Sequence, residues 1–132
     1  SYAEGRGEID DALAAARWLA EQHPGLPLTL MGFSFGSCVA GNAAERLEEQ
    51  GAELAQLFML APPVERFDVD LPERCPLTVI QPEADEVVTP ERVYAWSAEL
   101  SKPHELIRMP ECSHFFHGKL IELKDLIQAR LA

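Results

Sequence analysis

The chain has 132 residues, of which 47% are hydrophobic and 25% are charged, and its formal net charge is −11. This length and composition predict one ordinary globular domain over residues 1–132. The negative charge argues against nucleic acid or an anionic membrane as a partner, because phosphate groups are bound by clustered Lys and Arg. The sequence also has no apolar run near the roughly 18 residues that predict a membrane-spanning helix.

Three cysteines are spread widely along the chain, at Cys38, Cys75 and Cys112. Their odd number and wide spacing argue against a disulfide framework or a zinc site. We expect each of them to be a small buried hydrophobic residue, and a reducing cytoplasm is the compartment that suits such thiols.

The first half of the chain alternates a helix, a strand and a second helix. Apolar residues recur at helical spacing from about Glu8 to Gln22, and a Pro-Gly pair ends this predicted helix. The apolar run from Leu28 to Met31 predicts a buried strand. A second helix is expected to start at Ser34, or just after it, and to end at about Gln50.

The second half continues the alternation with shorter elements. Buried strands are predicted over residues 57–61, 77–80 and 106–109. Thr89 is a candidate N-cap with Pro90 at the first helical position, so a helix is expected there. The last helix is predicted from four apolar residues: Leu120, Leu123, Ile127 and Leu131. Helices that alternate with strands predict an α/β fold, with a mostly parallel sheet and helices on both faces.

The segment Gly32-Phe33-Ser34-Phe35-Gly36 matches the pattern G-x-S-x-G and lies between a predicted strand and a predicted helix, as this motif requires. In that setting the serine sits on a tight turn with small neighbours, and its hydroxyl is exposed. The backbone N–H of Phe35 would then face a developing oxyanion. Ser34 is therefore the candidate nucleophile, and the alternative is an ordinary N-cap serine at a glycine turn.

A serine nucleophile needs a base, and the base needs a carboxylate that orients it. Asp85 follows the third predicted strand and His114 follows the fourth, so both lie with Ser34 at the carboxyl ends of parallel strands. Loops at that edge of a sheet converge on one crevice. We therefore expect Ser34, Asp85 and His114 to act as nucleophile, acid and base.

Other carboxylates and histidines compete for two of these roles. Glu83 and Glu86 flank Asp85 and remain alternatives for the acid, and His117 remains the alternative for the base. We expect neither a metal ion nor a cofactor, because no pair of these side chains has a convincing metal-binding spacing. The other two histidines precede strands, at the opposite edge of the predicted sheet, and are expected on the surface: His23 and His104.

Three segments together resemble one family: GFSFG at residues 32–36, ADEVVTPERVYAW at 84–96 and SHFFHGKL at 113–120. They are similar to the small, capless, dienelactone-hydrolase-like branch of the α/β-hydrolase superfamily, and the resemblance covers nearly the whole chain. It implies the C-terminal part of an α/β-hydrolase fold, with Ser34, Asp85, His114 and the Phe35 N–H in the roles given above. Residues 62–75, where relatives insert a cap domain, are too few for one, so an open site is expected.

Two features depart from the family pattern. Pro82 stands where relatives tend to have Gly, which predicts a differently shaped acid loop. The family also has several strands N-terminal to the part that is matched here, and these carry the loop that donates the second oxyanion N–H. Residues 1–8 do not supply them, so we expect the chain to be N-terminally incomplete, in keeping with a first residue, Ser1, that is not Met.

The leading expectation is a cytoplasmic serine hydrolase that cleaves a small carboxylic ester or thioester through an acyl-enzyme. The alternative is an incomplete or accessory chain that is inactive without a partner or the missing segment. In the family's sheet order, one neighbour of the strand from Leu28 to Met31 belongs to that segment, so this apolar edge would be bare. We expect the edge to be covered, most simply in a two-fold homodimer.

Overall fold

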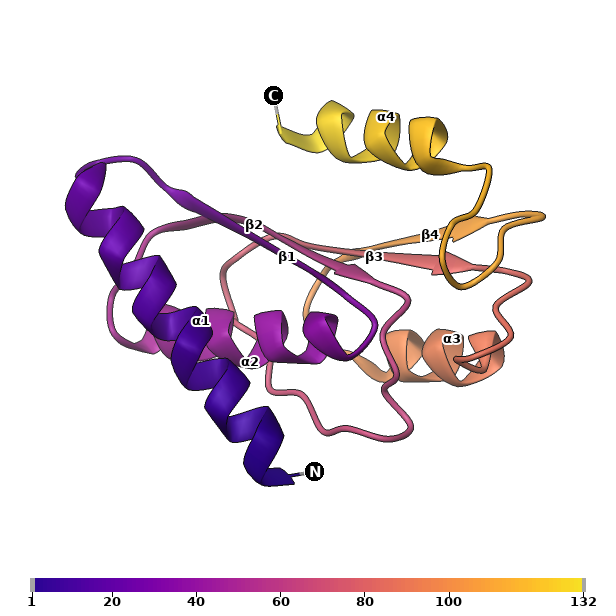
Figure 1. Cartoon of the computed structure of the whole chain (residues 1–132), viewed down its shortest axis with the longest axis horizontal. Coiled ribbons are helices and arrows are strands. Elements are labelled where there is room, and N and C mark those ends of the chain that lie inside the picture. Colours follow the sequence, from indigo (N-terminus) through magenta and orange to yellow (C-terminus); the bar gives the residue numbers. More distant parts are fainter. Residues whose placement is uncertain (1, 132) are drawn as a thin grey trace.

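The computed structural model describes residues 2–131, with side chains from Gly5 onward. Within these residues four helices alternate with four strands (Figure 1). The bounds of the elements are α1 Tyr2–Gln22, β1 Leu28–Phe33, α2 Phe35–Glu49, β2 Leu54–Leu60, β3 Leu77–Pro82, α3 Pro90–Glu99, β4 Glu105–Met109 and α4 Leu120–Leu131.

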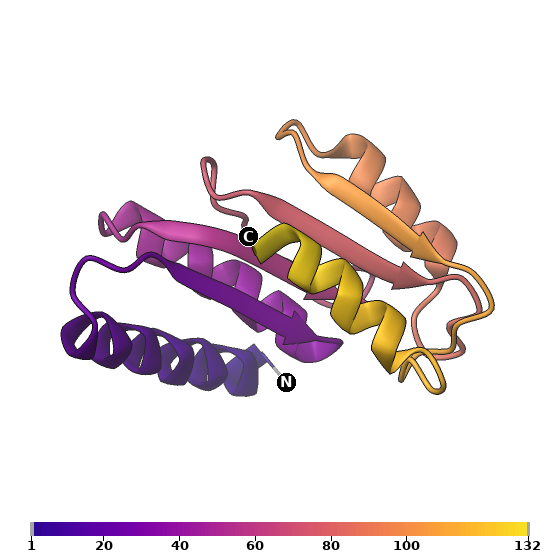
Figure 2. The same ribbon diagram turned by 90° about the horizontal axis from the view of Figure 1, so that it is seen from above.

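The strands form one parallel sheet in the order β1-β2-β3-β4. The helices α1, α2 and α3 cover one face of this sheet, and α4 lies across the other (Figure 1, Figure 2). The predicted fold class, a parallel sheet with helices on both faces, is therefore confirmed. Because all four strands run in the same direction, the loops that follow them come out at one edge of the sheet.

The two central strands bury both of their faces, because successive side chains of a strand point to opposite sides. Leu57 and Met59 of β2 belong to the core on the side of α2 and α3. Phe58 and Leu60 point the other way and join Leu123 of α4. Every residue of β3 is buried. The carboxyl ends of these strands are thus held in a closely packed core.

Two helices differ from their predicted form. The first helix begins at Tyr2, six residues before the predicted Glu8, and continues through Gly5 and Gly7. These glycines lower helix propensity by about 1 kcal/mol each, which is why the sequence pattern placed the start after them. The last helix spans Leu120–Leu131, as its four apolar residues predicted, but its two end residues are not covered: Leu120 is 64% and Leu131 51% exposed.

The segment between β2 and β3 has no helix or strand and is tied to α2. The side chain of Asn42 donates to the carbonyl of Asp68 at 3.3 Å and accepts from the amide of Asp70 at 2.9 Å. Farther along, the Glu48 carboxylate accepts the backbone N–H groups of three consecutive residues: Glu73, Arg74 and Cys75. No cap domain is present in this segment, as its length predicted.

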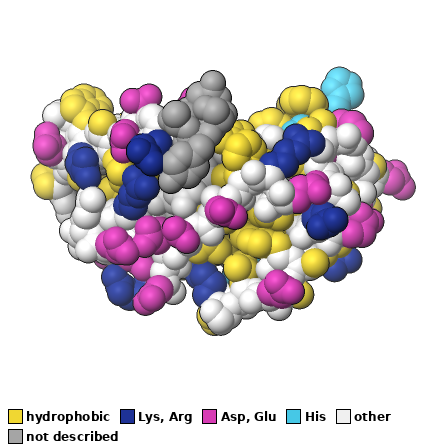
Figure 3. All heavy atoms as spheres, turned by 90° about the horizontal axis from the view of Figure 1, so that it is seen from below, with side chains coloured by type: hydrophobic (Ala, Val, Ile, Leu, Met, Phe, Trp, Pro, Cys, Tyr) yellow, Lys and Arg dark blue, Asp and Glu magenta, His cyan; other side chains and the backbone are white. Residues whose placement is uncertain are grey.

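Acidic and basic side chains are interspersed over the face that α1, α2 and α3 form (Figure 3). On this face, the acidic side chains are therefore interspersed with basic ones rather than gathered in a single patch. None of the helices within residues 2–131 is both long enough and apolar enough to cross a membrane.

Candidate active site

The turn that carries Ser34 joins β1 to α2 and has an unusual backbone. Ser34 has φ 54° and ψ −126°, and its N–H donates to the carbonyl of Leu60 at 2.8 Å. A Cβ placed on Gly32 would lie 2.1 Å from the carbonyl oxygen of Gly36. Only glycine fits at position 32, because the chain folds back on itself there. The first glycine of the motif is thus required by the turn itself.

The hydroxyl of Ser34 does not cap the helix that it precedes. Ser34 occupies the N-cap position of α2 but makes no side-chain capping hydrogen bond. Its Oγ instead lies 3.2 Å from Nε2 of His114. Ser34 is therefore not an ordinary N-cap serine, which was the alternative interpretation of the motif.

His114 lies on the loop after β4, with its ring enclosed. Its side chain is 2% exposed, and Nδ1 lies 2.9 Å from Oδ2 of Asp85. A carboxylate only accepts hydrogen bonds, so Nδ1 carries the proton and the Nε2 of the neutral ring accepts one. This tautomer leaves Nε2 able to accept a proton from the Ser34 hydroxyl.

The Asp85 carboxylate is fully buried and meets donors at both of its oxygens. Oδ1 accepts the backbone N–H groups of Val87, at 2.8 Å, and of Val88, at 2.7 Å. Oδ2 accepts from His114 and from Nε2 of Gln81, at 3.0 Å. A carboxylate without protons is the form that can accept four such bonds.

The acid loop and the base loop are tied together by backbone hydrogen bonds. The N–H of Glu83 donates to the carbonyl of Met109, and the N–H of Ala84 donates to that of Cys112, each at 2.9 Å. Pro82 is the last residue of β3, where its missing N–H leaves this pairing intact. The position of Asp85 relative to His114 is therefore set by the backbone.

The competing residues lie elsewhere. Glu83, Glu86 and His117 are all exposed and do not take part in these contacts. His23 is exposed as predicted. The expectation for His104 is wrong: it is half-buried, because its ring contacts Ser97 Oγ at 2.5 Å and the carbonyl of Lys102 at 2.9 Å. That contact joins α3 to the start of β4, at the opposite edge of the sheet.

Phe35 is the first residue of α2 and follows the nucleophile candidate directly. The first N–H groups of a helix have no acceptor within the helix and carry its positive end. The Phe35 N–H therefore remains the predicted oxyanion donor. Its ring packs on Phe67, with centroids 4.8 Å apart.

Two exposed aromatic rings border His114. Phe33 precedes Ser34 and its ring centroid lies 4.9 Å from that of His114; Phe115 follows His114 at the same centroid distance. Phe33 is 38% and Phe115 65% exposed. The opening of the site among the described residues thus has an apolar rim.

The cysteines are poor nucleophiles by comparison. Burial raises the pKa of Cys38 and of Cys75 to about 11, and burial also raises the pKa of Cys112. All three are buried and free, as predicted. Because the thiolate is the reactive form, these thiols are nearly unreactive at neutral pH.

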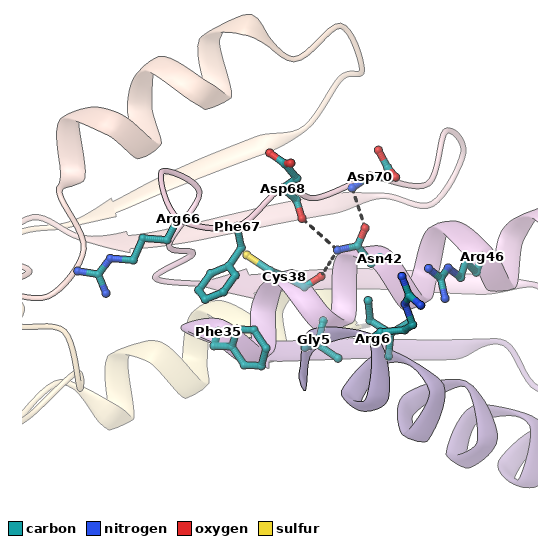
Figure 4. Close-up of a pocket in the computed structure, with 12 residues that line it drawn as sticks. Gly5, Arg6, Phe35, Cys38, Asn42, Arg46, Arg66, Phe67, Asp68 and Asp70 are labelled. Atoms are coloured by element: carbon teal, nitrogen blue, oxygen red, sulfur yellow. Dashed lines mark hydrogen bonds between the residues drawn. The ribbon is translucent and has the colours of Figure 1, made fainter. Parts of the chain in front are cut away.

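A groove of about 830 Å³ lies beside the Ser34 turn, between α1, α2 and the β2–β3 segment (Figure 4). Phe35 and Phe67 line one part of it, and Arg6 and Arg46 line another. Ser34, Asp85 and His114 do not line it. The groove is therefore next to the site in sequence, through Phe35, but is not lined by the three residues of the site.

Sequence reasoning missed Gln81, the second partner of Asp85 Oδ2. A signal was available, because Leu77, Val79 and Gln81 alternate on one face of β3 and only the third is polar. A polar side chain at the carboxyl end of a buried strand, four residues before the acid candidate, is unexpected on packing grounds.

Comparison with known families gives one domain match. Residues 9–74, half of the chain, match the model of the thioesterase domain. The matched part includes the Ser34 turn and ends before Asp85 and His114.

Solved structures match almost the whole chain. An α/β serine hydrolase without a lid, from Xanthomonas campestris, is 43% identical with a TM-score of 0.85, over 96% of this chain and 56% of that one. An α/β serine hydrolase homologue from Coxiella burnetii is 36% identical with a TM-score of 0.82, over 97% of this chain and 60% of that one.

A curated relative, an uncharacterized protein of Rickettsia prowazekii, is 29% identical over 137 residues, which is 96% of this chain and 56% of the relative. The chain thus spans between 56% and 60% of the length of these three relatives.

Proposed function

This chain belongs to the thioesterase domain family, with the α/β-hydrolase fold, and from that premise we propose that it is a serine hydrolase acting on carboxylic esters or thioesters. Ser34 is the nucleophile, His114 the base and Asp85 the acid that orients it. The observation that carries this proposal is the Ser34 hydroxyl, which leaves its own helix uncapped and lies 3.2 Å from the ring nitrogen of His114.

In the acylation half of the reaction, Ser34 Oγ forms a bond to the carbonyl carbon of the substrate while Nε2 of His114 takes the hydroxyl proton. The carbonyl electron pair moves onto oxygen, and the resulting oxyanion faces the N–H of Phe35 at the positive end of α2. When the tetrahedral species collapses, the bond to the alcohol or thiol breaks. The leaving group departs with the proton that His114 returns.

In the deacylation half, a water molecule gives a proton to His114 and attacks the acyl-Ser34 ester. Collapse of the second tetrahedral species releases a carboxylic acid and restores the serine hydroxyl. Asp85 keeps its charge throughout and stabilises the imidazolium that forms twice in the cycle.

The rim of the site favours small or accessible substrates with an apolar group near the carbonyl. Phe33 and Phe115 offer exposed ring surface on either side of His114, and no cap covers them within the described residues. The three buried free thiols favour a cytoplasmic protein.

Turnover of a panel of short-chain esters and thioesters tests the proposal. Ser34→Ala and His114→Ala are each expected to lower kcat by at least about a thousandfold. His117→Ala is the matched control, because this histidine is exposed and three residues away, and its turnover should equal that of the unchanged chain. Equal losses in the two histidine variants would overturn the assignment of the base.

A second candidate function is an accessory or incomplete hydrolase chain that needs a partner for activity. It is supported by the single oxyanion donor, the Phe35 N–H, that lies next to Ser34 at the start of α2. Losing one oxyanion donor lowers kcat by about 10²–10³. Turnover of this chain equal to that of the Xanthomonas relative would exclude this candidate, and a deficit of that size would support it.

A further inference from the structure

Gln81 occupies a position where packing favours an apolar side chain. It is the second-last residue of β3 and is 0% exposed. Leu77 and Val79, on the same face of the strand, belong to the hydrophobic core beneath α2 and α3. The amide of Gln81 therefore occupies a position at the edge of that core where an apolar side chain is expected.

The orientation of the amide is fixed by its two neighbours. Nε2 of Gln81 lies 3.0 Å from Oδ2 of Asp85 and 3.0 Å from the carbonyl oxygen of Pro82. Both neighbours are acceptors, so the atom between them must be the NH2 group, which donates one proton to each. The other end of the amide, Oε1, is buried and has no hydrogen-bond partner among the described residues.

The unpaired Oε1 of Gln81 lowers the stability that this side chain can contribute to the fold. A buried acceptor without a partner destabilises a protein, and its presence calls for a separate explanation. The donation to Asp85 supplies one. Val87 and Val88 hold Oδ1, and Gln81 and His114 hold Oδ2, so the carboxylate cannot rotate away from the ring that it orients.

We propose that Gln81 is a positioning residue, which fixes the Asp85 carboxylate and, through it, the ring of His114 for proton transfer at Ser34. This inference rests on the proposed function of the three residues. Gln81 does not touch the substrate and acts only through Asp85.

The first test is spectroscopic and does not depend on turnover. The proton between His114 Nδ1 and Asp85 Oδ2 gives a downfield ¹H NMR signal, which His114→Ala identifies by removing it. In Gln81→Met, which keeps the length of the side chain but has no donor, this signal is expected to move or broaden because Oδ2 loses one of its two donors. Gln81→Leu repeats the test if the first variant does not fold.

Thr78→Val is the matched control, since Thr78 is a buried polar residue of the same strand that faces the other side of the sheet. It should leave the signal in place. An unchanged signal in Gln81→Met would overturn the proposal, and so would an equal change in Thr78→Val.

The second test compares stability with kinetics. In Gln81→Met, kcat should fall about tenfold with KM unchanged, a loss of about 1.4 kcal/mol in transition-state stabilisation, on the scale of one hydrogen bond. Its Tm should change little, because the loss of the two donated hydrogen bonds is offset by removal of the unpaired oxygen. A joint fall of Tm and kcat would mean a structural role and would overturn the proposal.

The two proposals fail separately. If Ser34→Ala still turns over the substrates, the proposed function is wrong whatever Gln81 does. If Ser34→Ala abolishes turnover while Gln81→Met leaves the signal and kcat unchanged, only the role of Gln81 is wrong.

Discussion

At the scale of single residues, the two glycines of the G-x-S-x-G motif have different roles. The motif presents them as equivalent small neighbours of the serine. In the structure a Cβ on Gly32 would overlap the backbone of Gly36, whereas a Cβ on Gly36 meets nothing within 4 Å outside its own helix. The turn therefore depends on the first glycine, and the second lies in the first turn of α2.

We predict opposite effects of alanine at these two positions. Gly32→Ala forces the backbone of the turn apart, so it should lower the free energy of unfolding by about 1–3 kcal/mol or more and abolish labelling of Ser34. Gly36→Ala adds helix propensity and should raise stability by up to about 1 kcal/mol. Urea denaturation of both variants measures the difference, and equal destabilisation would contradict this account of the turn.

A further prediction concerns the aromatic rim. Phe115→Ala removes exposed ring surface next to His114 and should raise KM for aryl esters about 2- to 10-fold, the range expected for loss of one aromatic contact. Acetate esters of small alcohols should be affected less. Ile121→Ala, which removes an exposed apolar side chain from α4, is the control. A similar change in KM for both ester classes would show that the ring does not contact the substrate.

At the scale of elements, the sequence predicted the order, type and approximate bounds of all eight helices and strands within the described residues. The spacing of apolar residues allowed this prediction, because a strand that is buried on both faces consists of a short continuous run of apolar residues. It could not show which apolar residues of the last helix are covered. Leu123 is buried in the core beside Phe58 and Ile80, whereas Leu120 is exposed.

The main residues of the candidate site were also predictable from the sequence. The motif and the ends of the strands pointed to Ser34, Asp85 and His114, which the structure brings together. The sequence marked Gln81 as an unexpected polar residue, but it did not give its partners, nor those of Glu48, because each contact depends on where a loop returns to the sheet or helix. The local sequence does not indicate which part of the sheet or helix a loop will contact.

Glu48 gives a prediction at this scale. Burial by itself raises the pKa of its carboxyl, but hydrogen bonds from the amides of Arg74, Cys75 and Glu73 outweigh burial, and the pKa is lowered. A lowered pKa in the folded state means that the carboxylate stabilises the fold at neutral pH. This contribution is lost as pH falls below the ordinary Glu value of about 4.3 and through the folded-state pKa.

Glu48→Gln should therefore lower the free energy of unfolding by about 1–3 kcal/mol at pH 7, since an amide cannot accept as strongly from three N–H groups. The deficit should shrink as pH is lowered below about 4. Denaturation curves at several pH values measure it. Glu53→Gln, at an exposed position shortly after the same helix, should change little. A deficit that stays constant down to low pH would show that the charge is not responsible.

At the scale of the whole molecule, β1 is one of the two edge strands of the sheet within the described residues. Within residues 2–131 it pairs with β2 alone, and alternate side chains along it are exposed. Met31 is 54% and Phe33 38% exposed, and both point to the face opposite Leu28 and Leu30, which pack against the core of α1 and α2. Unpaired N–H and C=O groups on an apolar edge are a template for association.

We propose that this edge is covered in solution, most simply by the same edge of a second copy. Sedimentation should detect a two-fold dimer of the chain. Met31→Lys brings two like charges together at such an interface and should shift the equilibrium toward monomer. Ile121→Lys, on α4, should leave the dimer intact. A stable monomer of the unchanged chain would contradict the prediction.

The central claim is that Ser34 is made nucleophilic by His114 and Asp85, and labelling with a fluorophosphonate probe tests it most directly. At neutral pH, mass spectrometry of the digested protein should find one adduct, on the peptide that contains Ser34. Ser34→Ala should abolish the adduct without unfolding the chain, because the hydroxyl makes no capping bond. His114→Ala should slow its formation, and His117→Ala should not. An adduct that persists in Ser34→Ala, or that forms only on another residue, would contradict the claim.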